Sequence, residues 1–256
     1  MPTFAPRLMD RREFTGQLLT LLGDTRFLWL PVSSETTTST DRSLNARTLT
    51  YNATFASQYS ALGSGVAASF DGTTDYGSTP DAANLSFGDG TVDSAFTLLM
   101  LANITDSAAE RALLAKYTTT GAQTEWLWAL TSGDKMAVYL NDTSASAQPS
   151  RLSDAVVTQG AWKLYGATYS AATGGATAAN DITLYEDGRV IASTAANDAL
   201  YVAMEDTTSV VEVGARTAAS FLPGSAGFAA IVAGNLSASN HWAIKELING
   251  YYGLSL

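Results

Sequence analysis

The sequence predicts an all-β protein, a two-sheet antiparallel sandwich with a short helix near each end of the chain. Short apolar segments recur along most of its length, separated by Gly, Asn and Asp clusters rather than by helical patterns. Residues are 46% hydrophobic and only 15% charged, with many Ala, Thr, Ser and Gly and few of the Lys and Glu that cover exposed helices. One large domain of 256 residues with a short appendage is therefore expected.

A helix is predicted over residues 7–22, ended by Gly23. The apolar side chains that share one face at helical spacing are Phe14, Leu18, Leu21 and Leu22. This face either packs on its own domain or forms a docking arm that binds a partner or a second copy, which would make an oligomer. We assign residues 1–25 to an N-terminal helical arm or docking segment, and 26–256 to the sandwich.

From residue 27 onwards the pattern changes to strands. The predicted strands are Phe27–Leu30, Val66–Phe70, Phe96–Ala102, Leu113–Tyr117, Trp126–Leu130, Met136–Leu140, Trp162–Tyr169, Ile182–Glu186, Val190–Ser193, Val210–Val213 and Phe228–Val232. The connection 171–180 is predicted to be a hairpin tip. A second helix is predicted through Trp242 and Leu247, capped by Ser237 or Ser239 and ended near Gly250 or Gly253.

Eight short motifs occur in a fixed order. They are Trp29, Asp41-Arg42-Ser43-Leu44-Asn45, Phe70-Asp71-Gly72 followed by Tyr76, Phe96-Thr97, Gly160-Ala161-Trp162, Tyr185-Glu186-Asp187-Gly188, Val213-Gly214-Ala215 and Asn235-Leu236-Ser237. Their order, over roughly Phe27 to Gly253, resembles the laminin G-like branch of the concanavalin A-like lectin/glucanase superfamily. The resemblance implies a two-sheet antiparallel jelly roll. It does not imply one function, because this superfamily includes lectins, glycosidases, adhesion modules and structural domains.

Charge and cysteine content exclude several classes of partner and site. The net charge is −10, whereas a protein that binds the phosphates of nucleic acid needs a positively charged surface. Residues 1–30 carry a net charge of +1, which leaves −11 for residues 31–256. The N-terminal segment therefore differs in charge from the acidic remainder of the chain. No stretch has the length and apolarity of a membrane span. The absence of cysteine excludes disulfides and thiolate chemistry, and the N-terminus lacks signal-peptide features, so synthesis in a cytoplasm is expected.

Catalysis is not predicted. Retaining glycosidases need two carboxylates about 5 Å apart, and this superfamily's glucanases carry them in a Glu-x-Asp-x-(x)-Glu pattern that the chain lacks. Glu205, Asp206 and Glu212 are the nearest cluster, and their spacing breaks strand alternation. The single histidine, His241, has no matching nucleophile motif, and one His without Cys excludes a structural zinc site.

Calcium is the one ion that the residues suggest, and no other cofactor is expected. Its carboxylate ligands would come from Asp41, Asp71 and Asp75, with Asp81 and Asp89 as further candidates. The segment Arg216–Ser220 lacks the acidic residues with which pentraxin-like relatives bind calcium.

Trp126 and Trp128 are the candidate glycan-binding residues. They are two positions apart, so both side chains lie on the same face of a strand. They either belong to the core or line a concave surface on which sugars would stack.

Two function hypotheses follow. In the first, the protein is a non-catalytic structural component of a virion, such as a capsid decoration, head fibre or tail-associated protein of a bacteriophage, with other virion proteins as partners. In the second, it is a carbohydrate-binding module for a cell-surface glycan. A glycan-cleaving enzyme is a third, weaker alternative.

Overall fold

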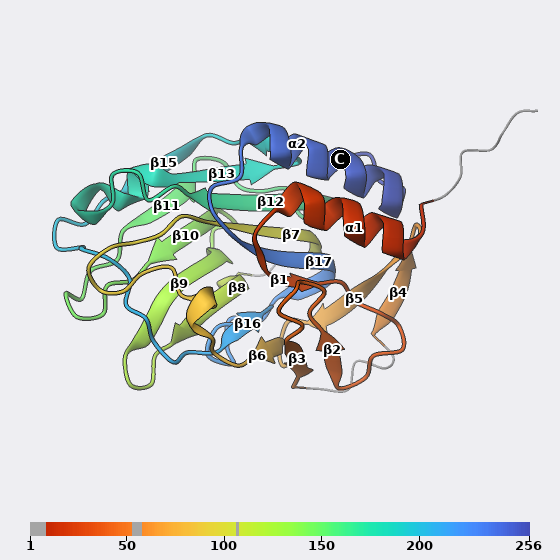
Figure 1. Ribbon diagram of the computed structural model, residues 1–256, viewed down its shortest axis with the longest axis horizontal. Helices are drawn as coiled ribbons and strands as arrows, with labels where there is room; N and C mark the ends of the chain where they lie inside the picture. The colour runs from red at the N-terminus through yellow and green to blue at the C-terminus, as the bar shows by residue number, and fades with distance from the viewer. Residues whose placement is uncertain (1–8, 53–57, 106–107) are drawn as a thin grey trace, which may run out of the picture.

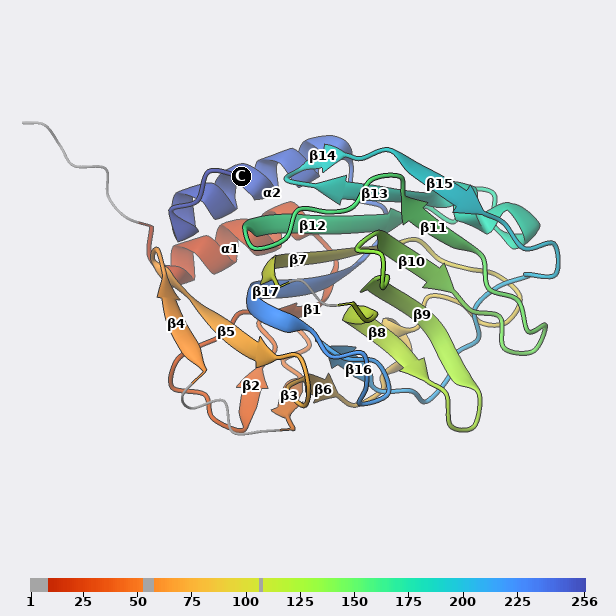
Figure 2. The same cartoon turned by 180° about the vertical axis from the view of Figure 1, so that it is seen from behind.

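The computed structural model describes residues 9–52, 58–105 and 108–256. These residues form two antiparallel sheets packed face to face, with two helices over the outer face of one sheet (Figure 1, Figure 2). No helix among them combines the length and apolarity that crossing a bilayer requires. The predicted all-β sandwich with an N-terminal and a C-terminal helix is confirmed.

Sheet A lies beneath the helices. Its eight strands are β1 (Thr25–Trp29), β4 (Tyr59–Leu62), β5 (Gly65–Asp71), β7 (Phe96–Ile104), β12 (Trp162–Tyr169), β13 (Ile182–Glu186), β14 (Arg189–Val190) and β17 (Pro223–Ala233). The order is β14-β13-β12-β7-β17-β5-β4, with β1 also paired to β17.

Sheet B forms the other layer. Its nine strands are β2 (Thr38–Thr40), β3 (Thr48–Tyr51), β6 (Gly77–Thr79), β8 (Arg111–Thr118), β9 (Gln123–Leu130), β10 (Met136–Leu140), β11 (Ser150–Ser153), β15 (Ser193–Ala196) and β16 (Val211–Val213). The order is β15-β11-β10-β9-β8-β16-β6-β3-β2. The sequence predicts Val190–Ser193 as one strand, but the chain leaves sheet A after Val190 and joins sheet B at Ser193.

Strand β7 shows how the layers are built. Leu98 and Met100 belong to the core between the two sheets, whereas Leu99 and Leu101 belong to the core beneath the helices. Successive side chains of a strand point to opposite faces, so a strand buried on both sides needs a continuous apolar run. This explains why the Phe96–Ile104 segment is apolar at nearly every position.

The two helices are α1 (Arg11–Leu22) and α2 (Ala238–Tyr252). The Asp10 side chain accepts the Glu13 backbone N–H and caps α1, so the helix begins after Asp10 and not at residue 7 as predicted. Residues 7 and 8 lie outside the described residues. Ser237 caps α2 in the same way, and Gly253, at φ 66°, ends it.

Helix α2 packs tightly on β12. A Cβ added to Gly166 would lie 2.9 Å from His241 Cε1 and 3.3 Å from a Leu99 methyl carbon. Gly166→Ala should therefore lower the free energy of unfolding by about 1–3 kcal/mol, because the overpacked helix must shift. Urea denaturation measures this effect. Gly16→Ala, on the open face of α1 with nothing within 4 Å of the added Cβ, is the control and should not destabilise the protein.

Candidate functional site

The outer face of sheet B carries a floor of small and apolar side chains. Ala115, Leu127 and Tyr139 are register partners across β8, β9 and β10, so their side chains point to the same face. The buried members of this floor are Ala112, Ala115, Leu127 and Ala129, and Tyr117 and Tyr139 pack against them. The two tyrosine side chains are only partly buried.

A hollow of about 180 Å³ lies between these tyrosines. The residues that line it are Glu110, Tyr117, Leu127, Tyr139, Gln148 and Arg216. The Arg216 guanidinium carbon lies 5.1 Å from the centre of the Tyr117 ring, and its Nη2 lies 2.9 Å from Glu110 Oε1. The hollow therefore combines two aromatic rings, a cation, a carboxylate and an amide.

A tight turn positions Arg216 over the sheet. The backbone groups of Arg216 and Ala219 exchange two hydrogen bonds of 2.9 Å, and Thr217 Oγ1 donates to the Tyr117 carbonyl oxygen at 2.9 Å. The Glu212 carboxylate accepts the N–H groups of Thr217 and Ala218, which both have positive φ. These bonds hold a strained turn in place. Burial raises the pKa of Glu212, although the two N–H donors oppose the shift.

The electrostatics of the hollow suit binding better than acid–base chemistry. Burial, together with the charge of Glu110, raises the pKa of Tyr139, so its phenol stays protonated and can donate a hydrogen bond. Glu110 is the one carboxylate among the lining side chains, whereas glycoside hydrolysis requires two. The arrangement offers stacking surfaces and hydrogen-bonding groups to a ligand.

Trp126 and Trp128 lie on the opposite face of β9 from Leu127. Both side chains are 0% exposed and belong to the core between the sheets, and Trp126 Nε1 donates to the Leu85 carbonyl oxygen at 3.3 Å. A sugar has no access to either ring in this structure. The placement matches the core alternative for this pair, and we locate the candidate glycan surface at Tyr117 and Tyr139 instead.

The apolar face of α1 is covered by the protein itself. Phe14 stacks on Tyr251 of α2 with ring centres 3.9 Å apart, and Leu18 and Leu22 are buried while Leu21 is partly buried. All four pack in the core between the helices and sheet A. The helix therefore belongs structurally to the sandwich, and this face is not free to serve as a docking surface.

The aspartates suggested for calcium bond to nearby protein groups in this structure. Asp41 accepts the N–H groups of Leu28 and Ser43, both at 2.8 Å. Burial opposes ionisation of Asp71, but hydrogen bonds from the Thr73, Thr74 and Asp75 segment hold its pKa well below the usual range. The remaining candidates bond to Gln58 (Asp75), Lys116 (Asp81) and Thr91 (Asp89). Residues 9–52, 58–105 and 108–256 contain no group of three or more His, Asp or Glu side chains placed to hold a metal.

The sequence interpretation did not single out Tyr117, Tyr139 or Arg216. A signal was present, because Ala115-Lys116-Tyr117 and Ala137-Val138-Tyr139 repeat an Ala-x-Tyr pattern on two predicted strands. A small residue two positions before an aromatic one leaves the ring without a tall neighbour on its face. Arg216 reaches the same place only through the folded turn, which spacing alone does not reveal.

Comparison with known proteins gives similarity in fold alone. No protein-family model and no curated protein matches the sequence. Among solved structures, the ligand binding domain of botulinum neurotoxin serotype D, in complex with N-acetylneuraminic acid, matches with a TM-score of 0.61 and 10% identity over 90% of this chain and 52% of that chain. The receptor binding domain of botulinum neurotoxin D matches with a TM-score of 0.63 and 10% identity, over 88% and 53%.

The binding domain of Paraclostridial Mosquitocidal Protein 1 matches with a TM-score of 0.62 and 14% identity, over 90% of this chain and 53% of that chain. The chain thus spans about half the length of these solved chains. The shared property is the β-sandwich. It agrees with the fold that the ordered motifs predict, and the superfamily itself stays a resemblance.

Proposed function

We propose that this protein is a non-catalytic carbohydrate-binding module that holds a glycan in the hollow on the outer face of sheet B. The observation that carries the proposal is the pair Tyr117 and Tyr139, which rise beside a hollow with Arg216 and Glu110 at its edge. Sugars have apolar ring faces that stack on aromatic rings, and hydroxyl groups that bond to charged side chains.

The similar solved structures support a binding role. Each is a binding domain, and one of them was solved with N-acetylneuraminic acid. Two carboxylates outside the hollow do not supply a catalytic pair. Glu212 is occupied by the turn that it holds, and Glu205 accepts the N–H groups of Thr143 and Ser144.

The virion hypothesis rests on the sequence alone. It was motivated by the absent signal peptide and cysteines and by the less acidic N-terminal segment. In it residues 1–25 dock the sandwich on the particle, but the apolar face of α1 is buried against α2 and sheet A. The glycan hypothesis, in contrast, has an exposed surface of matching chemistry, and we therefore prefer it.

A glycan array followed by calorimetry tests the proposal. Tyr117→Ala and Tyr139→Ala should each weaken binding about fivefold or more, since an aromatic contact contributes about 1 kcal/mol. The control is Trp242→Ala, which removes an exposed aromatic ring on α2, away from the hollow. Binding that survives both tyrosine changes, or an array on which no glycan is retained, would contradict the proposal.

A further inference from the structure

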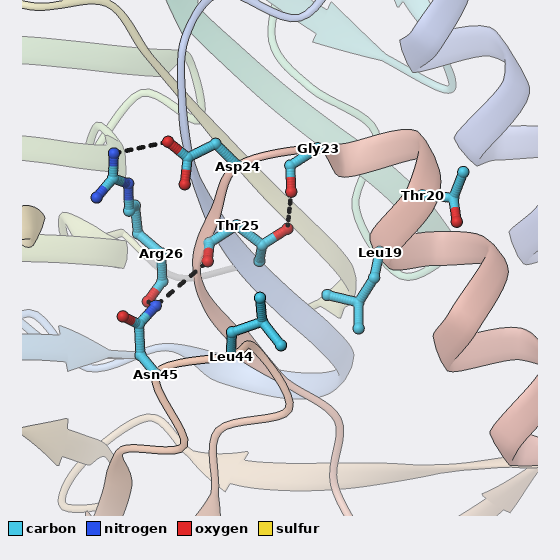
Figure 3. A pocket seen from close by; sticks show the side chains of 8 residues that line it. All are labelled: Leu19, Thr20, Gly23, Asp24, Thr25, Arg26, Leu44 and Asn45. Carbon is cyan, nitrogen blue, oxygen red and sulfur yellow. Dashed lines mark hydrogen bonds and ion pairs between the residues drawn. The ribbon is translucent and has the colours of Figure 1, made fainter.

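A second surface of distinct chemistry runs along α1, where the helix faces the segment 30–45. Two adjoining hollows of about 500 and 670 Å³ meet at Leu19, and we call them together the α1 groove. The lining side chains on which the argument depends are Arg11, Arg12, Leu19, Arg26, Arg42 and Leu44. Figure 3 shows the half of the groove that lies beside the C-terminal end of α1.

The α1 groove is positively charged on an acidic protein. Four arginines and one aspartate line it, a net charge of +3, whereas the whole chain carries −10. Glu35 pairs with Arg42 at 3.0 Å, and Asp24 pairs with Arg26 at 2.7 Å, which leaves Arg11 and Arg12 without a carboxylate partner among the described residues. The groove should attract an anionic ligand from solution.

The arginines also carry unused donors. The buried Nε atoms of Arg26 and Arg42 have no hydrogen-bond partner among the described residues. Burial first, and the like charge of Arg42 second, lower the pKa of Arg11 from its usual value. These Nε atoms are buried and not open to a ligand, but like charges held together at the surface are unfavourable until an anion neutralises them.

Apolar side chains lie among these cations. Leu44 is 101% exposed at the tip of its loop, and Figure 3 shows it facing Leu19 across the hollow. Val32 lines the other half. An exposed Leu44 and a partly buried Leu19 beside arginines favour a ligand that has both acidic and apolar groups. A polypeptide provides both, and a sulfated sugar or nucleic acid provides them less well.

The length of the groove fits an extended chain. From Arg11 to Gly23 the helix rises about 18 Å at 1.5 Å per residue, which five or six residues of extended peptide cover at about 3.3 Å each. We propose that the α1 groove binds an acidic, extended segment of a partner protein, with carboxylates at Arg11 and Arg12 and an apolar side chain between Leu19 and Leu44. This interaction is separate from glycan binding on sheet B.

Fluorescence anisotropy with the full chain tests the inference. The probe is a labelled ten-residue peptide of Asp and Glu with two Leu, compared with the same peptide carrying Lys at the acidic positions. The acidic peptide should bind, and binding should weaken as salt rises from 50 to 300 mM because the Debye length shortens. Arg12→Glu should weaken binding about tenfold, and Leu44→Asp should also weaken it.

Lys135→Glu is the matched control, since it makes the same change in net charge in the turn before β10 and should leave binding within twofold. Equal affinity of Arg12→Glu and the unaltered protein would overturn the inference, as would failure of the acidic peptide to bind. Displacement of the peptide by a sulfated oligosaccharide at lower concentration would overturn the peptide assignment in favour of an anionic glycan. A dimer in light scattering that Arg12→Glu abolishes would instead assign the groove to a second copy.

Discussion

Lys116→Met is expected to lower the free energy of unfolding by about 3–5 kcal/mol, the usual cost of leaving one partner of a buried ion pair alone. Lys116 and Glu125 are both 0% exposed, and Lys116 Nζ lies 2.5 Å from Glu125 Oε1. The same ammonium group lies 2.9 Å from Asp81 Oδ1 and donates to the Thr207 carbonyl oxygen at 2.7 Å. Methionine fills the space but supplies none of these interactions.

The loss of stability in Lys116→Met arises at Glu125, which is left without its cationic partner. Burial raises the pKa of this carboxyl group, although Lys116 and Thr207 both favour the ionised form. Without the lysine, the carboxylate must either stay charged in a buried site or take up a proton and weaken its bonds with Thr207. Thr207 lies in a segment without regular structure, so the same change should loosen the attachment of that segment to sheet B.

Urea denaturation at pH 7 measures the effect, with the midpoint and slope fitted together. Lys116→Met/Glu125→Gln should recover part of the stability, because the double variant no longer buries an unpaired charge. Lys135→Met removes a lysine from a turn and should change stability by less than about 0.5 kcal/mol. A loss below about 1 kcal/mol for Lys116→Met would show that the pair does not contribute as argued.

The sequence allowed the buried strands to be predicted, but not the polar ones. β10, β12 and β13 match their predicted bounds because each is rich in apolar side chains and is followed directly by polar loop residues. Five strands lie outside every predicted segment, namely β2, β3, β4, β6 and β11, and the prediction merged parts of β14 and β15 into one strand. β2, for example, has exposed Thr38 and Thr40 around one buried serine. Such strands are defined by their pairing with other strands, which local hydrophobicity does not record.

The candidate site was harder to predict than the fold for a related reason. The two-residue spacing of Trp126 and Trp128 correctly placed both side chains on the same face of β9. It does not show which face of the strand packs against the other sheet. The same limit applied to α1, whose amphipathic pattern is equally consistent with an internal and an external partner. The answer came from Tyr251 and Tyr252 of α2, more than 200 positions away in sequence, which pack on Phe14.

The second large effect is a loss of stability at low pH that arises from His241. This side chain is 0% exposed, and its ring stacks on Tyr185 with centres 3.7 Å apart. Neither ring nitrogen has a hydrogen-bond partner among the described residues. Burial therefore lowers the pKa of His241 from 6.5 to about 4.

Between pH 6.5 and 4 the unfolded chain binds a proton at this position and the folded protein does not. The stability that His241 contributes is therefore fully present above pH 6.5 and is lost as the pH falls towards 4. The loss should amount to about 3 kcal/mol, at 1.36 kcal/mol per pKa unit. Burial raises the pKa of Asp93, Glu125 and Glu212, so these groups change stability in the opposite direction over an overlapping range.

His241→Phe separates the histidine from these carboxyl groups, because phenylalanine keeps a ring against Tyr185 and does not titrate. Urea denaturation of both proteins at pH 7, 6, 5 and 4 gives the difference in unfolding free energy at each pH. That difference should shift by about 3 kcal/mol in favour of the phenylalanine variant between pH 7 and 4. Whatever constant offset the substitution introduces cancels in this comparison. Parallel stability curves for the two proteins would mean that His241 takes up its proton without leaving the folded state, and so that water reaches its ring.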